Sequence, residues 1–205
     1  MSMFRSLLKT NVGYNRIIDY NSSKSLNNNF AAHNGNKQFT ILSELDVDSS
    51  VTGFIGLFYS MSTLQSVSFV TNINTANITT MADMFSGCSR LQSIDLSNWN
   101  TSNVFAVNGM FEGCSSLMNV NLAGWDTSNL QYYDAMFRNC TNLRHLDIRS
   151  FTFNSNASTW STFGGVPNSC EIIVKSQTEK AWFASKFANL TNVKTVAEYE
   201  AEQNS

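Results

Sequence analysis

The stretch that decides the fold is residues 84–103, which read MFSGCSRLQSIDLSNWNTSN. The pattern returns 26 residues later at 110–129 as MFEGCSSLMNVNLAGWDTSN, and its first half returns again from residue 136 as MFRNCTNLRHLDI. A fixed period of this length is the signature of a repeat architecture, in which each copy buries its apolar face against its neighbours. Weaker copies flank these three at 57–69 and 163–174, so we expect about five repeats.

Each copy predicts a strand, a polar turn and a short helix. Residues 91–96 (LQSIDL) end in an apolar–polar–apolar alternation, which is typical of a strand with one buried face. Residues 98–103 have turn and cap chemistry, and apolar residues three to four apart in 104–111 predict a one-faced helix. Gly87 and Gly113 lie where the chain leaves that helix.

The fold class expected from this pattern is an α/β repeat. It is a right-handed, leucine-rich-repeat-like solenoid of about five 26-residue rungs, with a parallel sheet on one face and short helices on the other. The chain of 205 residues divides into an N-terminal attachment segment and polar linker at 1–36, the repeat solenoid at 37–175, and a C-terminal cap at 176–205. Residues 37–42 (KQFTIL) predict a capping strand on the first repeat.

The C-terminal cap is expected to contain a helix, a strand and a tail. Ser176-Gln-Thr-Glu179 is a capping-box pattern that opens a helix. The aromatic residues of that helix would pack on the last repeat; they are Trp182, Phe183 and Phe187. Residues 190–196 predict one more strand, and residues 197–205 are expected to form a polar tail that frays.

Composition excludes several classes of protein. The net charge of −2 leaves no basic footprint for nucleic acid or an anionic membrane. No stretch approaches the ~20 apolar residues of a membrane helix, so we expect no membrane insertion. The sequence contains no recognisable Ser-His-Asp order or glycine-rich phosphate loop, and its aspartates fall at repeat-equivalent positions. We therefore expect no enzyme activity, no metal and no cofactor.

Three columns of residues recur at the repeat period: Cys88, Cys114 and Cys140; Ile73, Trp99, Trp125 and Phe151; and Asn77, Asn103 and Asn129. The cysteines could form disulfides or a metal site, but Met61 and Val166 replace them in the end repeats, which favours buried thiols. The aromatic column could stack on glycans, and burial in the core is the favoured alternative. The asparagines are expected to bond the backbone of a neighbouring repeat.

The outward face of the predicted sheet is the best candidate for recognition, because repeat proteins commonly bind on such continuous surfaces. The candidate binding residues are Ser93, Asp95, Asn119, Asn121, Arg144, His145 and Asp147. This column is mixed and lightly charged, which suits a carbohydrate or a modest protein contact. The alternative is an ordinary solvated face.

Residues 84–103 resemble the BspA-type leucine-rich repeat, also catalogued as a mycoplasma-type surface repeat, and the resemblance extends over residues 53–196. The resemblance implies a bacterial surface protein that binds host proteins or other cells, or a short phage-type member found among tail or fibre genes. It implies no shared catalytic residues.

The short repeat array favours the phage-type member, as do the lack of a signal-peptide-like apolar run near the N-terminus and of an anchor motif. We expect a non-catalytic binding or structural module of a phage virion (tail, fibre or head-fibre), assembled in the host cytoplasm and serving host-cell attachment. Its expected partners are other virion or surface proteins through residues 1–36, a bacterial surface glycan or protein, and copies of itself. The alternatives are a bacterial cell-surface or secreted adhesin and a purely structural decoration protein.

Overall fold

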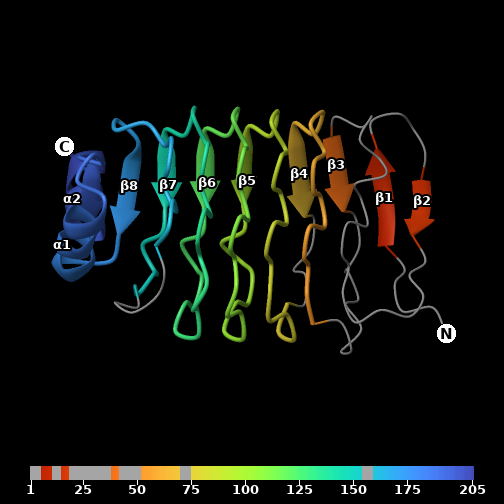
Figure 1. The fold of residues 1–205 in the computed structure, drawn as a ribbon, viewed down its shortest axis with the longest axis horizontal. Helices are drawn as coiled ribbons and strands as arrows, with labels where there is room; N and C mark the ends of the chain where they lie inside the picture. Colours follow the sequence, from red (N-terminus) through yellow and green to blue (C-terminus); the bar gives the residue numbers. More distant parts are fainter. Residues whose placement is uncertain (1–5, 11–14, 19–37, 42–51, 70–74, 154–158) are drawn as a thin grey trace.

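The computed structural model describes residues 6–10, 15–18, 38–41, 52–69, 75–153 and 159–205. It is an α/β structure in which the strands lie side by side in one long row, with two short helices at the C-terminal end (Figure 1). The strands are β1 Ser6–Thr10, β2 Asn15–Ile18, β3 Gln38–Ile41, β4 Ser66–Phe69, β5 Ser93–Asp95, β6 Asn119–Asn121, β7 His145–Asp147, β8 Glu171–Val174 and β9 Val193–Thr195, and the helices are α1 Gln177–Lys186 and α2 Val196–Gln203.

Strands β5 to β9 form a five-stranded sheet in which every neighbouring pair is parallel. From β5 to β8 the register follows the 26-residue period: Ile94 pairs with Val120, Val120 with Leu146, and Leu146 with Ile172. All four side chains are buried, because alternate residues of a strand point to opposite faces of the sheet. The strands predicted within the repeats and within residues 190–196 are confirmed.

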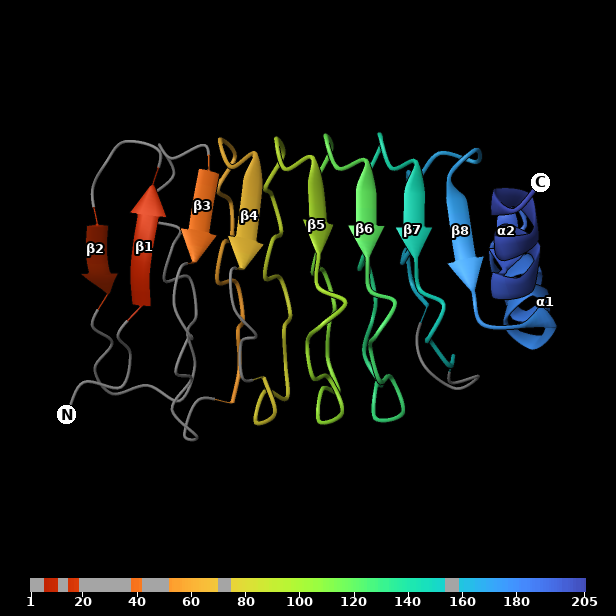
Figure 2. The ribbon, with the colours of Figure 1, turned by 180° about the vertical axis from the view of Figure 1, so that it is seen from behind.

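A second sheet lies on the N-terminal side of β5, in the order β2-β1-β3-β4. Strand β3 pairs in parallel with β4, which confirms the strand predicted at 37–42. Strands β1 and β2 are antiparallel and continue the row beyond β3, as seen from behind in Figure 2. The rest of the predicted attachment segment and linker at 1–36 lies outside the described residues.

The segments that return from each strand to the next do not form the predicted helices. Residues 81–88 and their equivalents are successive turns. The amide of Asp83 donates to the carbonyl oxygen of Asn108 in the next repeat, at 2.9 Å, and Phe85 and Gly87 donate to the next repeat in the same way. Most of the amides between them donate back within the segment. The helix prediction is wrong because an α-helix uses its amides internally, whereas every second amide here bonds a neighbouring repeat.

This alternation requires left-handed backbone at two positions of each turn segment. In the repeat that begins at Gly109, φ is +63° at Gly109 and +72° at Gly113. The preceding repeat has the same conformation at Asp83 and Gly87, at +55° and +76°. Glycine adopts positive φ without the steric cost that a Cβ imposes. Gly87 and Gly113 therefore do mark a backbone requirement, although they close no helix.

The core lies between the sheet and the turn segments, and a column of stacked phenylalanines runs through it. The rings are Phe58, Phe85, Phe111, Phe137 and Phe163, with successive centroids 5.0, 5.5, 5.6 and 5.5 Å apart. The tryptophan column is also in the core, as predicted: Trp99 and Trp125 are buried, and the Trp125 Nε1–H donates to Leu96 O at 2.9 Å. Ile73, assigned to the same column, lies outside the described residues.

The C-terminal cap closes the stack with aromatic side chains. Helix α1 begins after Ser176, whose hydroxyl accepts from the amide of Thr178, and this confirms the predicted helix start. The Glu179 carboxylate accepts from the Ser176 hydroxyl, which differs from the bonding of a capping box. Phe183 is fully buried, and Trp182 and Phe187 pack against the core beside it. The centroids of the Phe183 and Phe187 rings lie 5.2 and 4.8 Å from that of the Phe163 ring. This is the predicted packing of the helix on the last repeat, and it terminates the phenylalanine column.

The expectation that residues 197–205 fray is wrong, because most of them form α2. Thr195 caps the helix, and Glu198 completes a capping box by accepting from the Thr195 amide at 2.8 Å. The carboxylate of Glu198 also receives the ammonium group of Lys180 of α1 at 2.7 Å. Capping together with ion pairing orders a polar segment that has no buried apolar residue of its own.

Candidate functional site

The outward face of β5 and β6 brings four of the predicted binding residues together. Ser93 lies opposite Asn119, and Asp95 lies opposite Asn121. Three of these side chains are exposed, and that of Asn121 is half-buried. Because the strands are in register, the four form two short polar rows that run across the sheet.

Two of these four side chains also hold the turn that follows their strand. The Asp95 carboxylate accepts the amide N–H of Ser97 at 2.9 Å, and the Asn121 side-chain oxygen accepts that of Ala123 at 3.1 Å. Burial raises the pKa of Asp95, but hydrogen bonds from Ser97 and Asn121 outweigh it, so the net shift is downward. Asp95 is therefore ionised at neutral pH. Because Asp95 and Asn121 both accept amides of the turns that follow their strands, Ser93 and Asn119 are the two outward side chains of this group without a capping role.

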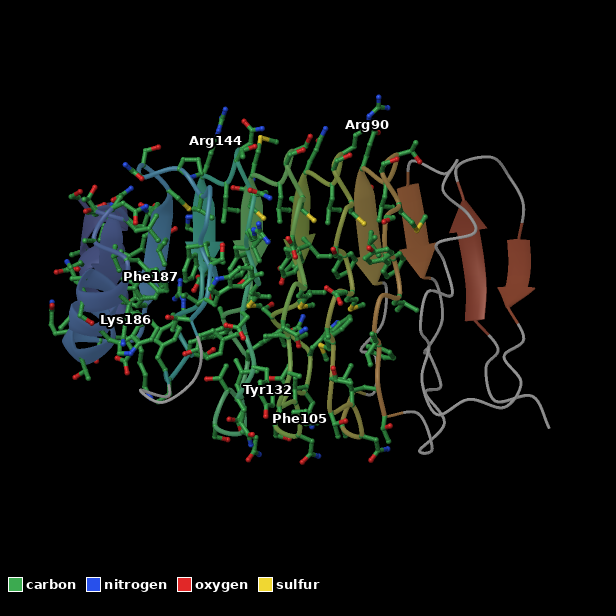
Figure 3. The ribbon with its side chains drawn as sticks, in the orientation of Figure 1. Arg90, Phe105, Tyr132, Arg144, Lys186 and Phe187 are labelled. Atoms are coloured by element: carbon green, nitrogen blue, oxygen red, sulfur yellow. The ribbon has the colours of Figure 1, made fainter. Side chains whose placement is uncertain are left out.

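Two of the remaining predicted residues extend the same rows onto β7, where His145 lies opposite Asn119 and Asp147 lies opposite Asn121, but both are held by neighbouring charged groups. His145 of β7 contacts Glu171 of β8, with 2.8 Å between Nδ1 and Oε2. Asp147 is buried and receives two hydrogen bonds from the Arg149 side chain on Oδ2, at 2.9 and 2.7 Å. Arg144 is exposed, at the edge of the molecule where the chain enters β7 (Figure 3).

Helix α2 closes this end of the sheet face. The Tyr199 ring lies 5.9 Å from the ring of His145 and equally 5.9 Å from the Arg149 guanidinium. Glu200 also contacts Arg149, at 3.6 Å. These contacts were not predicted, because residues 197–205 were expected to form a polar tail. The signal that could have found them is Thr195-Val-Ala-Glu198, a second capping-box pattern.

A row of charges continues from His145 across β8 and β9. Lys194 of β9 pairs with Glu171 at 2.9 Å and with Glu202 of α2. Burial of Glu171 acts to raise its pKa, but hydrogen bonds from Lys194 and His145 bring it below its ordinary value. Hydrogen bonds that the Lys194 ammonium group donates to Glu202 and Glu171 raise the pKa of Lys194. Opposite charges are therefore matched along this row, whereas the outward side chains of β5 and β6 are largely exposed.

The cysteine column is buried inside the stack, as predicted. Cys88, Cys114 and Cys140 are free thiols, each 3.1 Å from a carbonyl oxygen of the preceding repeat, those of Phe58, Phe85 and Phe111 respectively. Burial raises the pKa of Cys88 and of Cys140 to about 12. These thiols are therefore protonated at neutral pH and are poor nucleophiles. Among the described residues, no three His, Cys, Asp or Glu side chains gather into a possible metal site.

The asparagine column has the predicted structural role at Asn103 and Asn129, and the equivalent partner of Asn77 lies outside the described residues. Asn103 donates through its side-chain amide to Ala76 O, and Asn129 donates to Ser102 O, both at 2.7 Å. Each bond reaches back to the preceding repeat, so these side chains tie the polar turns of neighbouring repeats together.

Comparison with known families identifies the group to which the repeats belong. A family model described as "Mycoplasma protein of unknown function, DUF285" matches residues 24–151, which is more than half of the chain. No curated protein matches the sequence. Within the described residues, none of the helices is long and apolar enough to span a membrane. The match covers all three strong copies of the pattern at 84–103, and the chain therefore belongs to this family of BspA-like repeat proteins.

Proposed function

We propose that residues 37–175 form one right-handed solenoid of five 26-residue rungs. The stacked phenylalanine column supports this reading, because its five rings recur at intervals of 26 or 27 residues. The hydrogen bonds of the turn segments support it as well, since they link neighbouring repeats on the side away from the sheet. A stack bonded on both sides is a rigid support for a surface.

We further propose that this solenoid is a non-catalytic binding module. The observation that carries the proposal is the pair of exposed polar rows on β5 and β6, on a backbone whose register the neighbouring strands hold. The groups that could serve chemistry have structural roles: the thiols are buried with raised pKa values, and Asp95 and Asp147 accept backbone amides. Ser93 and Asn119 present hydroxyl and amide groups outward, and such groups bind polar ligands through hydrogen bonds.

The setting we propose is a phage virion, in which the module serves attachment to the host cell and residues 1–36 fix it to other virion proteins. An in-register stack with polar side chains facing outward is the kind of surface that attachment needs, and this supports the setting. A bacterial cell-surface adhesin or host-interaction module is the second candidate; the description of the matching family names a Mycoplasma protein and gives no function. In either setting the sheet face meets the surface of a cell.

Binding of the fluorescently labelled chain to a panel of intact bacteria tests the proposal. The test variant combines Ser93→Glu with Asn119→Lys, which places two long side chains on the polar rows as an opposite-charge pair. Asn98→Lys, at an exposed loop position, is the matched control. We expect saturable binding by the wild type and the control, with at least a tenfold weaker affinity for the double variant. If no bacterium on the panel binds the wild-type chain, the attachment function is wrong.

A further inference from the structure

Three aromatic side chains are exposed on the side of the repeats that carries the turns. Phe105, Tyr132 and Trp160 have 40%, 51% and 63% of their surfaces exposed. The rings of Phe105 and Tyr132 meet edge to face, with centroids 6.2 Å apart and planes at 76°. Figure 3 shows both at the edge of the molecule opposite to Arg90 and Arg144. We name these three residues the aromatic strip.

The repeat itself does not require aromatic residues at these positions. The residue 26 positions before Tyr132 is Ala106, and the two are bridge partners in neighbouring repeats. The residue 26 positions after Phe105 is Gln131, and the residue 26 positions before Trp160 is Asp134. Small or polar side chains therefore serve the fold equally well here. This contrasts with the buried tryptophan column, where every described position is aromatic and in the core.

Charged groups border the strip. The Arg138 guanidinium lies 5.2 Å from the centre of the Trp160 ring, and its Nη1 contacts the Glu112 carboxylate at 3.2 Å. The backbone amide of Trp160 donates to the Asp134 carboxylate at 2.9 Å, which fixes this residue against the preceding repeat. Both Arg138 and Glu112 are about a third exposed, so each has donor or acceptor capacity toward a ligand. The strip thus combines apolar ring faces with hydrogen-bonding groups of both signs.

We propose that the aromatic strip binds an extended oligosaccharide. A pyranose ring has flat faces of C–H groups and a rim of hydroxyls, so it needs both aromatic surface and polar neighbours. The rings lie in successive repeats, and neighbouring strands are about 4.8 Å apart, a step comparable with the length of one pyranose. A protein partner would favour a larger apolar area, whereas the Trp160 ring is bordered by the Arg138 guanidinium, which in turn contacts the Glu112 carboxylate.

This inference rests on the proposed binding function and names a ligand class and a second surface for it. The strip and the polar rows of β5 and β6 are on different sides of the repeat, so separate substitutions reach them. The departure of three residues from their repeat columns is the sequence signal for the strip. Comparison of equivalent positions could therefore have found it without the structure.

The test measures binding of the full chain to purified bacterial cell-wall polysaccharides, peptidoglycan and an array of defined oligosaccharides, followed by isothermal titration calorimetry or by co-sedimentation with insoluble material. The test variant is the triple substitution Phe105→Ala, Tyr132→Ala and Trp160→Ala. The matched control is Tyr59→Ala, which removes an exposed aromatic ring (44%) that is not part of the strip. Circular dichroism and the thermal unfolding midpoint confirm that both variants fold.

We expect the wild type and Tyr59→Ala to bind at least one polysaccharide, and the triple variant to bind it at least tenfold more weakly. The inference is overturned if the triple variant binds like the wild type, or if no polysaccharide or array glycan binds the wild type. It is also overturned if protease treatment of bacteria abolishes their binding to the chain, because the partner is then a protein. That result would leave the attachment function standing, whereas failure to bind any intact cell would remove it.

Discussion

The two sides of each repeat join neighbouring layers in different ways. On the sheet side, Ile94 and Val120 pair in parallel strands, a conformation that any L-residue adopts. On the turn side, every second amide bonds the next repeat, and the chain takes left-handed φ twice in each repeat, for example at Gly109 and Gly113. The outward positions of the sheet are therefore open to most side chains, whereas specific turn positions are restricted by the backbone.

This difference indicates where the protein can change its surface without losing its fold. Residues such as Ser93 and Asn119 contribute little to the stack and are available for recognition. On the turn side, the left-handed positions are restricted, and Phe105 and Tyr132 lie before the first of them in their repeats, Gly109 and Ala135. Both candidate binding surfaces thus lie where the backbone places no demand on the side chain.

The largest expected effect comes from the core that the two sides share. Phe111 is fully buried between two stacked rings, Phe85 and Phe137. Truncation by Phe111→Ala should cost about 3–5 kcal/mol of the free energy of unfolding, since it removes a large apolar side chain and leaves a cavity. Urea unfolding measures this, with the exposed Phe105→Ala as the control that should lose less than about 1 kcal/mol. Equal losses in the two variants would contradict the stacked column.

Substitution at a left-handed position should separate the turn side from the sheet side. Gly113 has φ of +72°, and a Cβ there would make ordinary van der Waals contact with the Gly87 backbone at 3.8 Å, so Gly113→Ala tests backbone strain rather than crowding. We expect a loss of about 1–2 kcal/mol. The sheet-side control, Ser93→Ala, should stay within about 0.5 kcal/mol of the wild type. A Gly113→Ala variant as stable as this control would show that the turn segments tolerate any residue.

The reverse substitution should stabilise the protein. Ala135 is held at φ of +55°, a conformation that costs a residue with a Cβ. Replacing it with glycine should gain about 0.5–1 kcal/mol after the entropic cost of glycine is subtracted. Ala106→Gly, at a buried position in the preceding repeat that is not left-handed, should instead lose about 0.5–1 kcal/mol. A loss of stability in both variants would contradict the claim that the left-handed φ at Ala135 destabilises the folded protein.

The smallest expected effect is an acid-induced release of α2. Hydrogen bonds from Lys180, the Thr195 amide and Gln177 lower the pKa of Glu198 from 4.5 to about 2. Because the pKa is lower in the folded state, the stabilisation that Glu198 gives is complete above its ordinary pKa and declines as the pH falls from 4.5 towards 2. NMR signals of α2 should therefore shift over this range before those of β6. Glu198→Gln should abolish the step, and α2 signals that follow β6 at every pH would contradict it.

The sequence predicted most of the fold because residues at a fixed period must occupy equivalent places. The strand register from Ile94 to Ile172 and the burial of the cysteine and tryptophan columns follow from that period. The turn segments could not be predicted in the same way, since a three-to-four apolar spacing is common to a helix and to successive turns with one buried face. Only the hydrogen-bond partners separate the two, and those partners lie in the next repeat.

The candidate site was predicted less completely. The grouping of Ser93, Asp95, Asn119 and Asn121 follows from the register, but the ion pairs of His145 and Asp147 depend on Glu171 and Arg149. Helix α2 covers His145 and Arg149, and its position depends on ion pairs between segments that are distant in the sequence, such as Arg149 with Glu200. No repeat period encodes those contacts.

Amide hydrogen exchange of the turn segments tests most directly the claim that the stack is bonded on both sides. The amides of Asp83, Phe85 and Gly87 donate to the next repeat at 2.9, 2.9 and 2.7 Å. We predict that they exchange as slowly as the strand amides of β6, because both open only when neighbouring layers separate. Exchange of these three amides at the rate of unprotected residues, with the strands still protected, would show that the layers are joined through the sheet alone.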